Sequence, residues 1–184
     1  MPTAQCGQTS YIGIGANLGD AAATVVAAVA ALADLPGCGL LRVSSLYRTA
    51  PVAASGPDFY NAVAELATDL SPEALLDALQ AIEATFCRQR PFVNAPRTLD
   101  LDLLLLGDVA QQTPRLMLPH PRLHQRAFVL QPLLELAPEL ALPGIGALAA
   151  TLPATAAQRV QRLHRLDLPS ARPARPKPAP TIPR

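Results

Sequence analysis

The sequence of 184 residues is short of several residue types, and each shortage excludes a class of protein. It contains no tryptophan, and aromatic residues make up only 4% of it, so an RNA-binding sheet with exposed stacking aromatics is not expected. Its 15 basic and 14 acidic residues nearly cancel, which provides no general attraction to nucleic acid or to an anionic membrane. Any positive charge that binds phosphate must therefore be local.

Cysteine is also scarce. Cys6, Cys38 and Cys87 are widely spaced and form no CxxC pair, so the sequence predicts neither a disulfide framework nor a zinc site. No stretch approaches the roughly 20 apolar residues that span a bilayer, and the N-terminus lacks a basic region followed by an apolar run. We therefore expect a protein of the reducing cytoplasm that is neither exported nor embedded in a membrane.

Apolar residues, in contrast, make up 50% of the sequence, which is enough for the core of one domain in a chain of this length. We predict a single domain over residues 1–168. Residues 169–184 consist mainly of Pro, Ala, Arg and Lys without apolar periodicity, which is typical of a disordered tail. The basic residues of this tail do not change the prediction that the chain binds no nucleic acid.

The spacing of apolar residues predicts a series of strands and helices. In chain order they are a strand over 10–15, a helix ending near 35, an extended segment over 40–47, a strand over 59–68, a helix starting at Ser71-Pro72-Glu73 and a leucine-rich strand over 98–107. This βαββαβ order matches an α+β fold of the ferredoxin-like kind, with an antiparallel sheet and helices on one face. A helix over 126–137 and one or two short helices within 146–166 are predicted as C-terminal additions.

Two aspartates interrupt the leucine-rich strand. In an extended backbone Asp100 and Asp102 lie on the same face, with Cα atoms about 6.5–7 Å apart, and the leucines around them lie on the other face. Magnesium prefers oxygen ligands and commonly joins a few carboxylates to substrate phosphates, so this pair is consistent with a metal site. A strand whose second face is merely solvated would show the same pattern, and the aspartates alone do not separate the two interpretations.

Three arginines precede this strand and favour the metal site. Arg88, Arg90 and Arg97 lie in the segment that leads into the aspartates, so fixed positive charge and acidic ligands reach one edge of the sheet. A nucleotide polyphosphate with magnesium needs that combination. The sequence contains neither a complete glycine-rich dinucleotide fingerprint nor a GxxxxGK[ST] motif, so a Rossmann or P-loop site is not expected.

Residues 96–102, Pro-Arg-Thr-Leu-Asp-Leu-Asp, resemble the signature of the hydroxymethyldihydropterin pyrophosphokinases of folate biosynthesis. Further segments that resemble this family follow its order along the chain, namely residues 11–19, 44–49, 59–62 and 118–128. The resemblance spans roughly residues 10–143 and leaves the C-terminal tail uncovered.

The resemblance implies transfer of the β,γ-pyrophosphoryl group of ATP to the hydroxymethyl oxygen of 6-hydroxymethyl-7,8-dihydropterin, with release of AMP. It implies that Asp100 and Asp102 bind two magnesium ions and that Arg88 and Arg97 stabilise the transferring group. Electrostatic positioning is the main need of such a transfer, so no covalent nucleophile is required. By the same match, the residues placed at the ATP are Gln80, Glu83, Arg90, His120 and Arg126.

For the pterin, the resemblance implies main-chain contacts near Thr49, Ala50 and Val52, a contact from the Asn61 side chain, and stacking between Phe59 and Phe128. A flat heteroaromatic ring is well held between two aromatic faces, and an amide offers both a donor and an acceptor to the ring edge. We expect the enzyme to act as a monomer on ATP and this pterin.

Each of these residues also has a structural interpretation. Phe59 and Phe128 would ordinarily be core residues, and Gln80 and Glu83 would ordinarily be exposed on a helix surface. Two further classes of function are a non-catalytic paralogue that binds pterin or nucleotide, and an RNA-binding module of the same fold. The retained aspartates and arginines argue against the first class, and the shortage of aromatics argues against the second.

Overall fold

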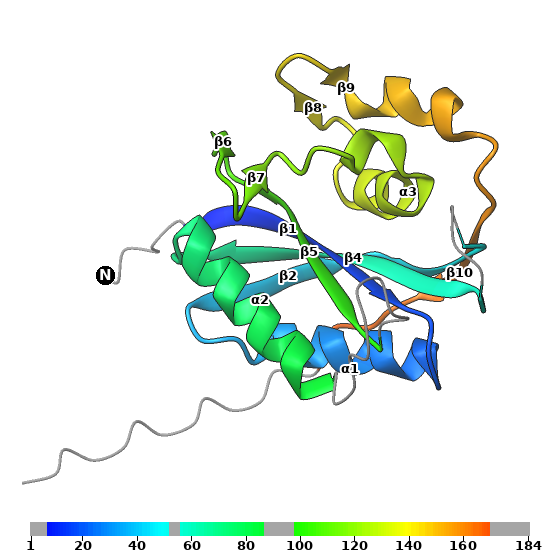
Figure 1. Ribbon diagram of the computed structural model, residues 1–184, viewed down its shortest axis with the longest axis horizontal. Helices are drawn as coiled ribbons and strands as arrows, with labels where there is room; N and C mark the ends of the chain where they lie inside the picture. Colours follow the sequence, from blue (N-terminus) through cyan, green and yellow to red (C-terminus); the bar gives the residue numbers. More distant parts are fainter. Residues whose placement is uncertain (1–6, 52–55, 87–97, 170–184) are drawn as a thin grey trace, which may run out of the picture.

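An antiparallel sheet of six strands forms the centre of the structure (Figure 1), a computed structural model that describes residues 7–51, 56–86 and 98–169. The sheet order is β10-β3-β4-β1-β5, and β2 pairs with β4 in line with β3. The long strands β1 and β4 are therefore central. The bounds of the six strands are β1 (Gln8–Ala16), β2 (Cys38–Val43), β3 (Ser45–Thr49), β4 (Phe59–Thr68), β5 (Asp100–Leu106) and β10 (Val160–Arg165).

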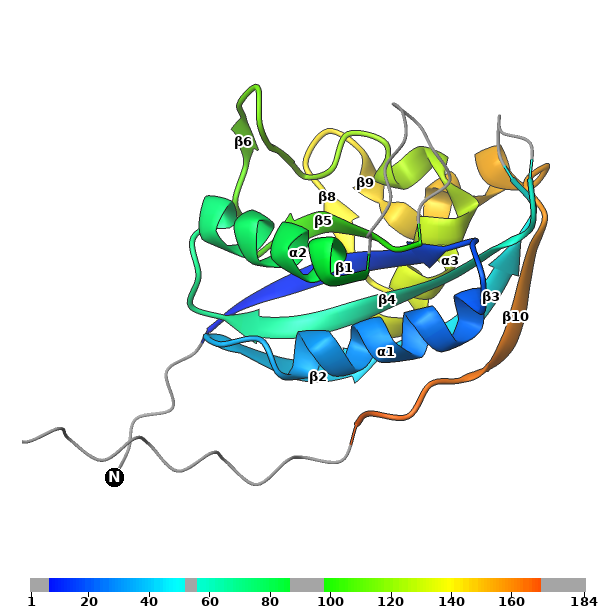
Figure 2. The same cartoon turned by 60° about the horizontal axis from the view of Figure 1, so that its bottom comes forward.

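Two helices, α1 (Ala21–Ala33) and α2 (Pro72–Phe86), cover one face of this sheet (Figures 1 and 2). Asp20 caps α1, because its Oδ1 accepts a hydrogen bond from the Ala23 amide at 3.0 Å. Ser71 does the same for α2, since its Oγ accepts from the Ala74 amide at 3.2 Å. The predicted helix start at Ser71 is thus confirmed.

The central strands turn their apolar side chains toward α1 and α2. On β1, Ile12 and Ile14 are at most 2% exposed and pack in this first core, while Gly13 and Gly15 alternate with them. Burying each isoleucine contributes about 1.5–3 kcal/mol. Because side chains alternate along a strand, the two glycines face the other side of the sheet and leave it bare there.

Helix α3 (Ala127–Leu136) lies on that other side, behind the sheet as seen in Figure 2. Leu130 and Leu133 of α3 form a second core with Val63 of β4 and Leu104 of β5, and all four are fully buried. The segments around α3 are short, namely β6 (Gln111–Gln112), β7 (Met117–Leu118), η1 (Leu123–Gln125), β8 (Ala141–Leu142), β9 (Gly146–Ala147) and η2 (Leu148–Thr155). They are the C-terminal additions to the sheet and its first two helices.

The start of α3 is held by a residue from further along the chain. Its N-cap residue, Arg126, makes no side-chain capping bond. The Gln158 side chain instead accepts from the Ala127 amide at 2.9 Å and donates to the Gln125 carbonyl at 2.8 Å. The segment before β10 thereby supplies a cap that the local sequence lacks.

The α+β class with an antiparallel sheet is confirmed, and so is the helix predicted over 126–137. The extended segment predicted over 40–47 forms two strands, β2 and β3, which both pair with β4. Among the described residues, no helix combines the length and the apolar character that crossing a membrane requires. The tail predicted over 169–184 lies outside the described residues from 170 onward.

The prediction of one or two short helices within residues 146–166 is confirmed by η2, whereas the strand that follows it was not predicted. That strand is β10, over residues 160–165. Five of the six residues of β10 are exposed, so the strand shows no apolar alternation that would reveal it. Its pairing with β3 supplies the backbone hydrogen bonds, and that partner is more than 100 residues away in the chain.

Candidate active site

A hollow opens on the α3 face of the sheet, beyond the start of α3. Gly13 and Gly15 form part of its floor, because neither places a side chain there. Strands β1, β3, β4 and β5 and helix α3 all contribute to its lining. The described residues that line it are Gly13, Ile14, Gly15, Thr49, Ala50, Phe59, Asn61, Ala62, Val63, Asp100, Asp102, Arg126, Phe128 and Val129.

The register of the sheet brings distant segments of the chain into rows across this floor. Asn61 of β4 lies opposite Gly15 of β1, and Gly15 lies opposite Asp100 of β5. In the next row Gly13 lies between Val63 and Asp102. Since neighbouring strands are about 4.8 Å apart, the backbones at Asn61 and Asp100 are separated by roughly 10 Å. An amide and a carboxylate thus flank an open strip of floor.

One end of the hollow is acidic. Asp100 and Asp102 are half-buried, and the leucines that alternate with them, Leu101 and Leu103, are at most 5% exposed in the core on the opposite face, as the sequence pattern predicts. Arg126 Nη1 lies 3.6 Å from Asp102 Oδ2, so a cation from the start of α3 reaches the same end. A carboxylate pair beside a guanidinium suits a polyphosphate with a divalent cation.

In the described part of the chain, side chains supply only part of a metal coordination sphere at Asp100 and Asp102. Within the described ranges, no three or more His, Cys, Asp or Glu side chains come together as a metal-binding group. A magnesium ion at Asp100 and Asp102 would therefore take its remaining ligands from phosphate and water. That division is usual for magnesium, which dehydrates reluctantly and binds through one or two carboxylates plus substrate phosphates.

Glu83 lies behind the aspartates. Its Oε1 accepts a hydrogen bond of 2.7 Å from the amide of Leu101, the residue between the two aspartates. Only 7% of Glu83 is exposed, so the alternative that it is an ordinary surface residue of α2 is wrong. Gln80 is exposed on the same helix, and neither residue lines the hollow. The contacts of these two residues with ATP stay predictions.

The other end of the hollow is aromatic and amide-lined. Phe59 and Phe128 are half-buried and both line it, so neither is a fully buried core residue. Asn61 is 4% exposed, and its Nδ2 donates to Thr49 Oγ1 at 2.9 Å, which fixes the orientation of the amide. The Arg126 guanidinium carbon lies 5.6 Å from the centroid of the Phe128 ring, a cation–π distance that links the two ends.

His120 lies next to this site without lining it. Its amide donates to the Leu104 carbonyl at 2.9 Å, and its Nδ1 accepts from the Arg122 amide at 3.2 Å. Burial lowers the pKa of His120 below its ordinary value, and the positive charges of Arg126 and Arg122 lower it further. The neutral imidazole is therefore the form favoured at neutral pH.

The structure brings together most of the described residues that the sequence predicts for the site. Those that line the hollow are Asp100, Asp102, Arg126, Thr49, Ala50, Phe59, Asn61 and Phe128. Four predicted residues lie outside the described part of the chain, namely Arg88, Arg90 and Arg97 for catalysis and ATP, and Val52 for the pterin. Sequence reasoning missed Gly13 and Gly15 as floor residues, although their alternation with isoleucines signals a bare strip on one face of β1.

Comparison with known families gives one match over most of the chain. The model of the family described as 7,8-dihydro-6-hydroxymethylpterin-pyrophosphokinase matches residues 11–138. A Pseudomonas aeruginosa protein named 2-amino-4-hydroxy-6-hydroxymethyldihydropteridine pyrophosphokinase is 45% identical over 157 residues, which cover 85% of this chain and 97% of that protein. A Haemophilus influenzae protein of the same name is 43% identical, over 73% of this chain and 85% of its own length.

Solved structures resemble the fold at lower sequence identity. A crystal structure described as HPPK-DHPS in complex with substrates has a TM-score of 0.65 and 13% identity, and the match covers 82% of this chain. A wild-type Plasmodium falciparum HPPK-DHPS structure with SDX-DHP gives a TM-score of 0.63 at 13% identity over 80% of this chain. The matches cover only 43% and 44% of those longer chains, respectively, and at this identity they show the fold alone.

Proposed function

We propose that this chain, which belongs to the 7,8-dihydro-6-hydroxymethylpterin-pyrophosphokinase family, transfers pyrophosphate from ATP to the hydroxymethyl group of 6-hydroxymethyl-7,8-dihydropterin in folate biosynthesis and releases AMP. The observation that carries the proposal is the cross-sheet row in which Asn61 and Asp100 flank Gly15. In this row the Asn61 amide can bind a flat polar ring and the Asp100 carboxylate can bind metal and phosphate, and Gly15 leaves the space between them open. No observation favours a non-catalytic paralogue.

The acidic end is proposed to hold ATP. Asp100 and Asp102 would bind magnesium, with two ions expected, and bound magnesium would neutralise charge on the phosphate oxygens. Arg126 and His120 would contact the nucleotide, because both lie beside the aspartates and one carries a fixed positive charge. The remaining assignments rest on the family resemblance: Arg88 and Arg97 on the transferring group, and Gln80, Glu83 and Arg90 at the ATP.

The aromatic end is proposed to hold the pterin. Phe59 and Phe128 would stack on the two faces of the ring, and Asn61 would pair with its polar edge. Thr49, Ala50 and Val52 would add contacts from the end of β3 and the residues after it. A ring bound by its edge at Asn61 directs its opposite substituent along the glycine floor toward Asp100, roughly 10 Å away.

We also propose that the core is ferredoxin-like in the full sense. The sheet order β3-β4-β1-β5, with α1 and α2 on one face, is what a βαββαβ unit of that kind requires if β2 and β3 count as one bent strand. The domain is proposed to span residues 1–168 and to act as a cytoplasmic monomer without a nucleic-acid or membrane partner.

The test is AMP release from ATP and magnesium, with and without the pterin. Asp100→Asn and Asp102→Asn should lower pterin-dependent AMP release by roughly 10²–10³-fold, since each removes charge stabilisation at the reacting phosphates. Asp108→Asn is the matched control, because Asp108 is exposed in the turn after β5 and lies outside the hollow. Activity that survives both substitutions would refute the assignment, and pterin binding without AMP release by the unaltered chain would favour the paralogue.

A further inference from the structure

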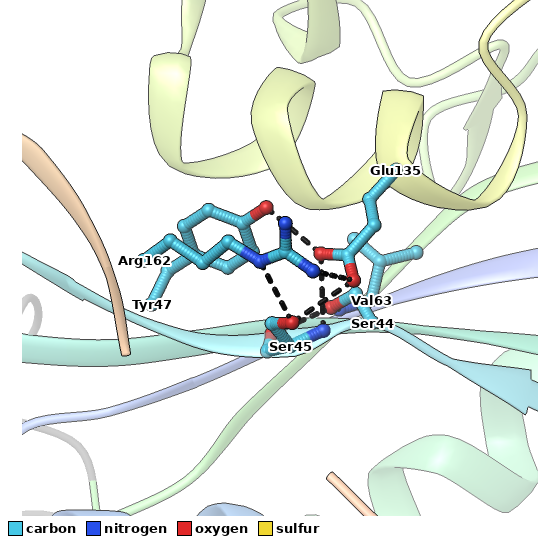
Figure 3. A network of polar contacts seen from close by, with 6 residues as sticks. All are labelled: Ser44, Ser45, Tyr47, Val63, Glu135 and Arg162. Atoms are coloured by element: carbon cyan, nitrogen blue, oxygen red, sulfur yellow. Dashed lines mark hydrogen bonds and ion pairs between the residues drawn. The ribbon is translucent and has the colours of Figure 1, made fainter. Parts of the chain in front are cut away.

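A carboxylate outside the hollow joins the two elements that form the walls of its aromatic end. Glu135 lies near the end of α3 and points toward β3 and β10, where it meets Ser45, Tyr47 and Arg162 (Figure 3). None of these four residues lines the hollow. The network therefore has no direct contact with the proposed ligands.

Both carboxylate oxygens of Glu135 are fully engaged. Oε2 accepts from the Ser45 amide at 3.1 Å and from the Tyr47 hydroxyl at 2.8 Å. Oε1 accepts from Ser45 Oγ and from Arg162 Nη2, each at 2.9 Å. Arg162 Nε also donates to Ser45 Oγ at 2.9 Å, so one node connects α3, β3 and β10.

The node around Glu135 lies at a fixed spacing, along α3 and across β3 and β4, from the residues that line the hollow. Phe128 and Glu135 lie two helical turns apart on α3, which is about 10 Å along a helix. On the sheet side, Tyr47 lies directly opposite Asn61, and Thr49 lies opposite Phe59. A shift of α3 along β3 would therefore move Phe128 relative to both Phe59 and Asn61.

The other contacts of α3 with the sheet do not fix such a shift. Leu130 and Leu133 pack on Val63 and Leu104, and hydrophobic contacts of this kind are strong but not directional. The ion pair between Glu135 and Arg162, whose side chains are 16% and 54% exposed, adds little net stability, yet the hydrogen bonds of Glu135 tolerate only small displacements. The chain carries such a pair where the register of α3 matters.

We propose that Glu135 is a positioning residue for the pterin, which acts through Ser45 and Tyr47 to hold Phe128 at the correct distance from Phe59 and Asn61. The proposal rests on the assignment of the aromatic end of the hollow to the pterin. Arg162 completes the node by placing a positive charge on the Oε1 side, so that β10 takes part in the same positioning.

Two substitutions test the node with little change of shape. Glu135→Gln keeps one oxygen acceptor and replaces the other oxygen by an amide group that donates hydrogen bonds. Whichever way the glutamine side chain is turned, this amide group faces a donor, either Arg162 on one side or the Ser45 amide and the Tyr47 hydroxyl on the other. Tyr47→Phe removes one hydrogen bond to Oε2 and keeps the buried ring. Glu139→Gln is the matched control, because Glu139 is exposed just beyond α3. KM for the pterin, KM for ATP, kcat and the melting temperature are measured for each variant of the full chain.

We expect Glu135→Gln to raise KM for the pterin about tenfold and Tyr47→Phe to raise it about threefold, in line with the loss of one to two hydrogen bonds. KM for ATP and kcat at saturating pterin should change by less than about twofold. The double variant should bind pterin no more weakly than Glu135→Gln alone, since both changes remove the same contact. The control should match the unaltered chain.

Phe128→Ala separates this inference from the proposed function. If Phe128→Ala leaves the KM for the pterin unchanged, the aromatic slot itself is wrongly assigned. If Phe128→Ala weakens pterin binding while Glu135→Gln and Tyr47→Phe do not, the slot stands and the positioning role is refuted. Equal losses for pterin and ATP, together with a lower melting temperature, would make Glu135 a residue of general stability and would also overturn the proposal.

Discussion

Substitution of Gly15 by alanine should separate folding stability from pterin binding. Gly15 lies in the middle of the sheet with an ordinary strand conformation, and glycine there costs about 0.5–1 kcal/mol relative to alanine. Among the residues that the structure describes, an added Cβ would meet one atom within 4 Å, Asn61 Oδ1 at 3.3 Å. The fold can therefore accept the methyl group, and the steric strain that it introduces is concentrated on the side-chain amide of Asn61.

That amide has little freedom to move away. Asn61 Nδ2 is bonded to Thr49 Oγ1 at 2.9 Å, so a retreat of a few tenths of an ångström weakens this bond or turns the amide from its orientation. The methyl group would also project onto the floor between Asn61 and Asp100. Overpacking of a fitted site costs about 1–3 kcal/mol, so we expect the pterin to bind about 5- to 150-fold more weakly.

The assay combines a calorimetric unfolding curve with a pterin titration of the same protein. Gly39→Ala on β2 is the control, because a Cβ at Gly39 meets no described residue within 4 Å and that strand contributes no residue to the hollow. Gly39→Ala should be as stable as the unaltered chain or slightly more stable, whereas in Gly15→Ala the gain from replacing a strand glycine is offset by the strain at Asn61, so its stability should change little. Only Gly15→Ala should lose pterin affinity, and unchanged affinity in that variant would refute the proposed floor of the site.

Two predictions concern pH. Burial acts to raise the pKa of Glu135, but hydrogen bonds from Tyr47 and Ser45 and the charge of Arg162 outweigh it and hold that pKa below the ordinary 4.5. The stability that Glu135 contributes is thus present above pH 4.5 and lost as pH falls through its folded-state pKa. When the free energy of unfolding is measured with urea from pH 5 downward, it should fall less steeply with pH for Glu135→Gln than for the unaltered chain. For His120, an NMR titration of the protein without metal or nucleotide should give a midpoint below the ordinary 6.5. Arg126→Gln should move that midpoint upward, because one of the charges that disfavour the imidazolium is gone. Arg115→Gln is the control and should leave the midpoint unchanged. An unchanged midpoint after Arg126→Gln would show that the charge of Arg126 has no influence on His120.

The local sequence pattern was enough to predict the helices and strands in which apolar and polar residues repeat at the spacing of that element. The alternation of leucine and aspartate in β5 places Asp100 and Asp102 on one face, and the structure has them there. The cap at Ser71 and the apolar face of α2 are likewise local signals. β10 could not be predicted in this way, because an exposed edge strand has no apolar side to reveal and depends on a distant partner for its pairing.

Carboxylates that bind partners from distant elements were the other part of the structure that the local sequence pattern does not predict. The sequence pattern predicts Glu83 to be a surface glutamate of an amphipathic helix, yet its side chain is buried and accepts a hydrogen bond from the Leu101 amide of β5. Glu135 reads as the polar position of α3, yet its partners Ser45 and Tyr47 lie about 90 residues earlier in the chain. Only the tertiary fold can tell a carboxylate that faces solvent from one that finds donors across such a distance.

The position of β1 explains why family-like segments so far apart in the sequence make one site. β1 lies between β4 and β5, so its side chains would ordinarily fill the space between Asn61 and Asp100. Glycine at positions 13 and 15 removes them on one face, while isoleucine at 12 and 14 keeps the core intact on the other. A single strand of alternating glycine and isoleucine therefore stabilises the sheet and opens the floor across which a pterin at Asn61 and phosphates at Asp100 would react.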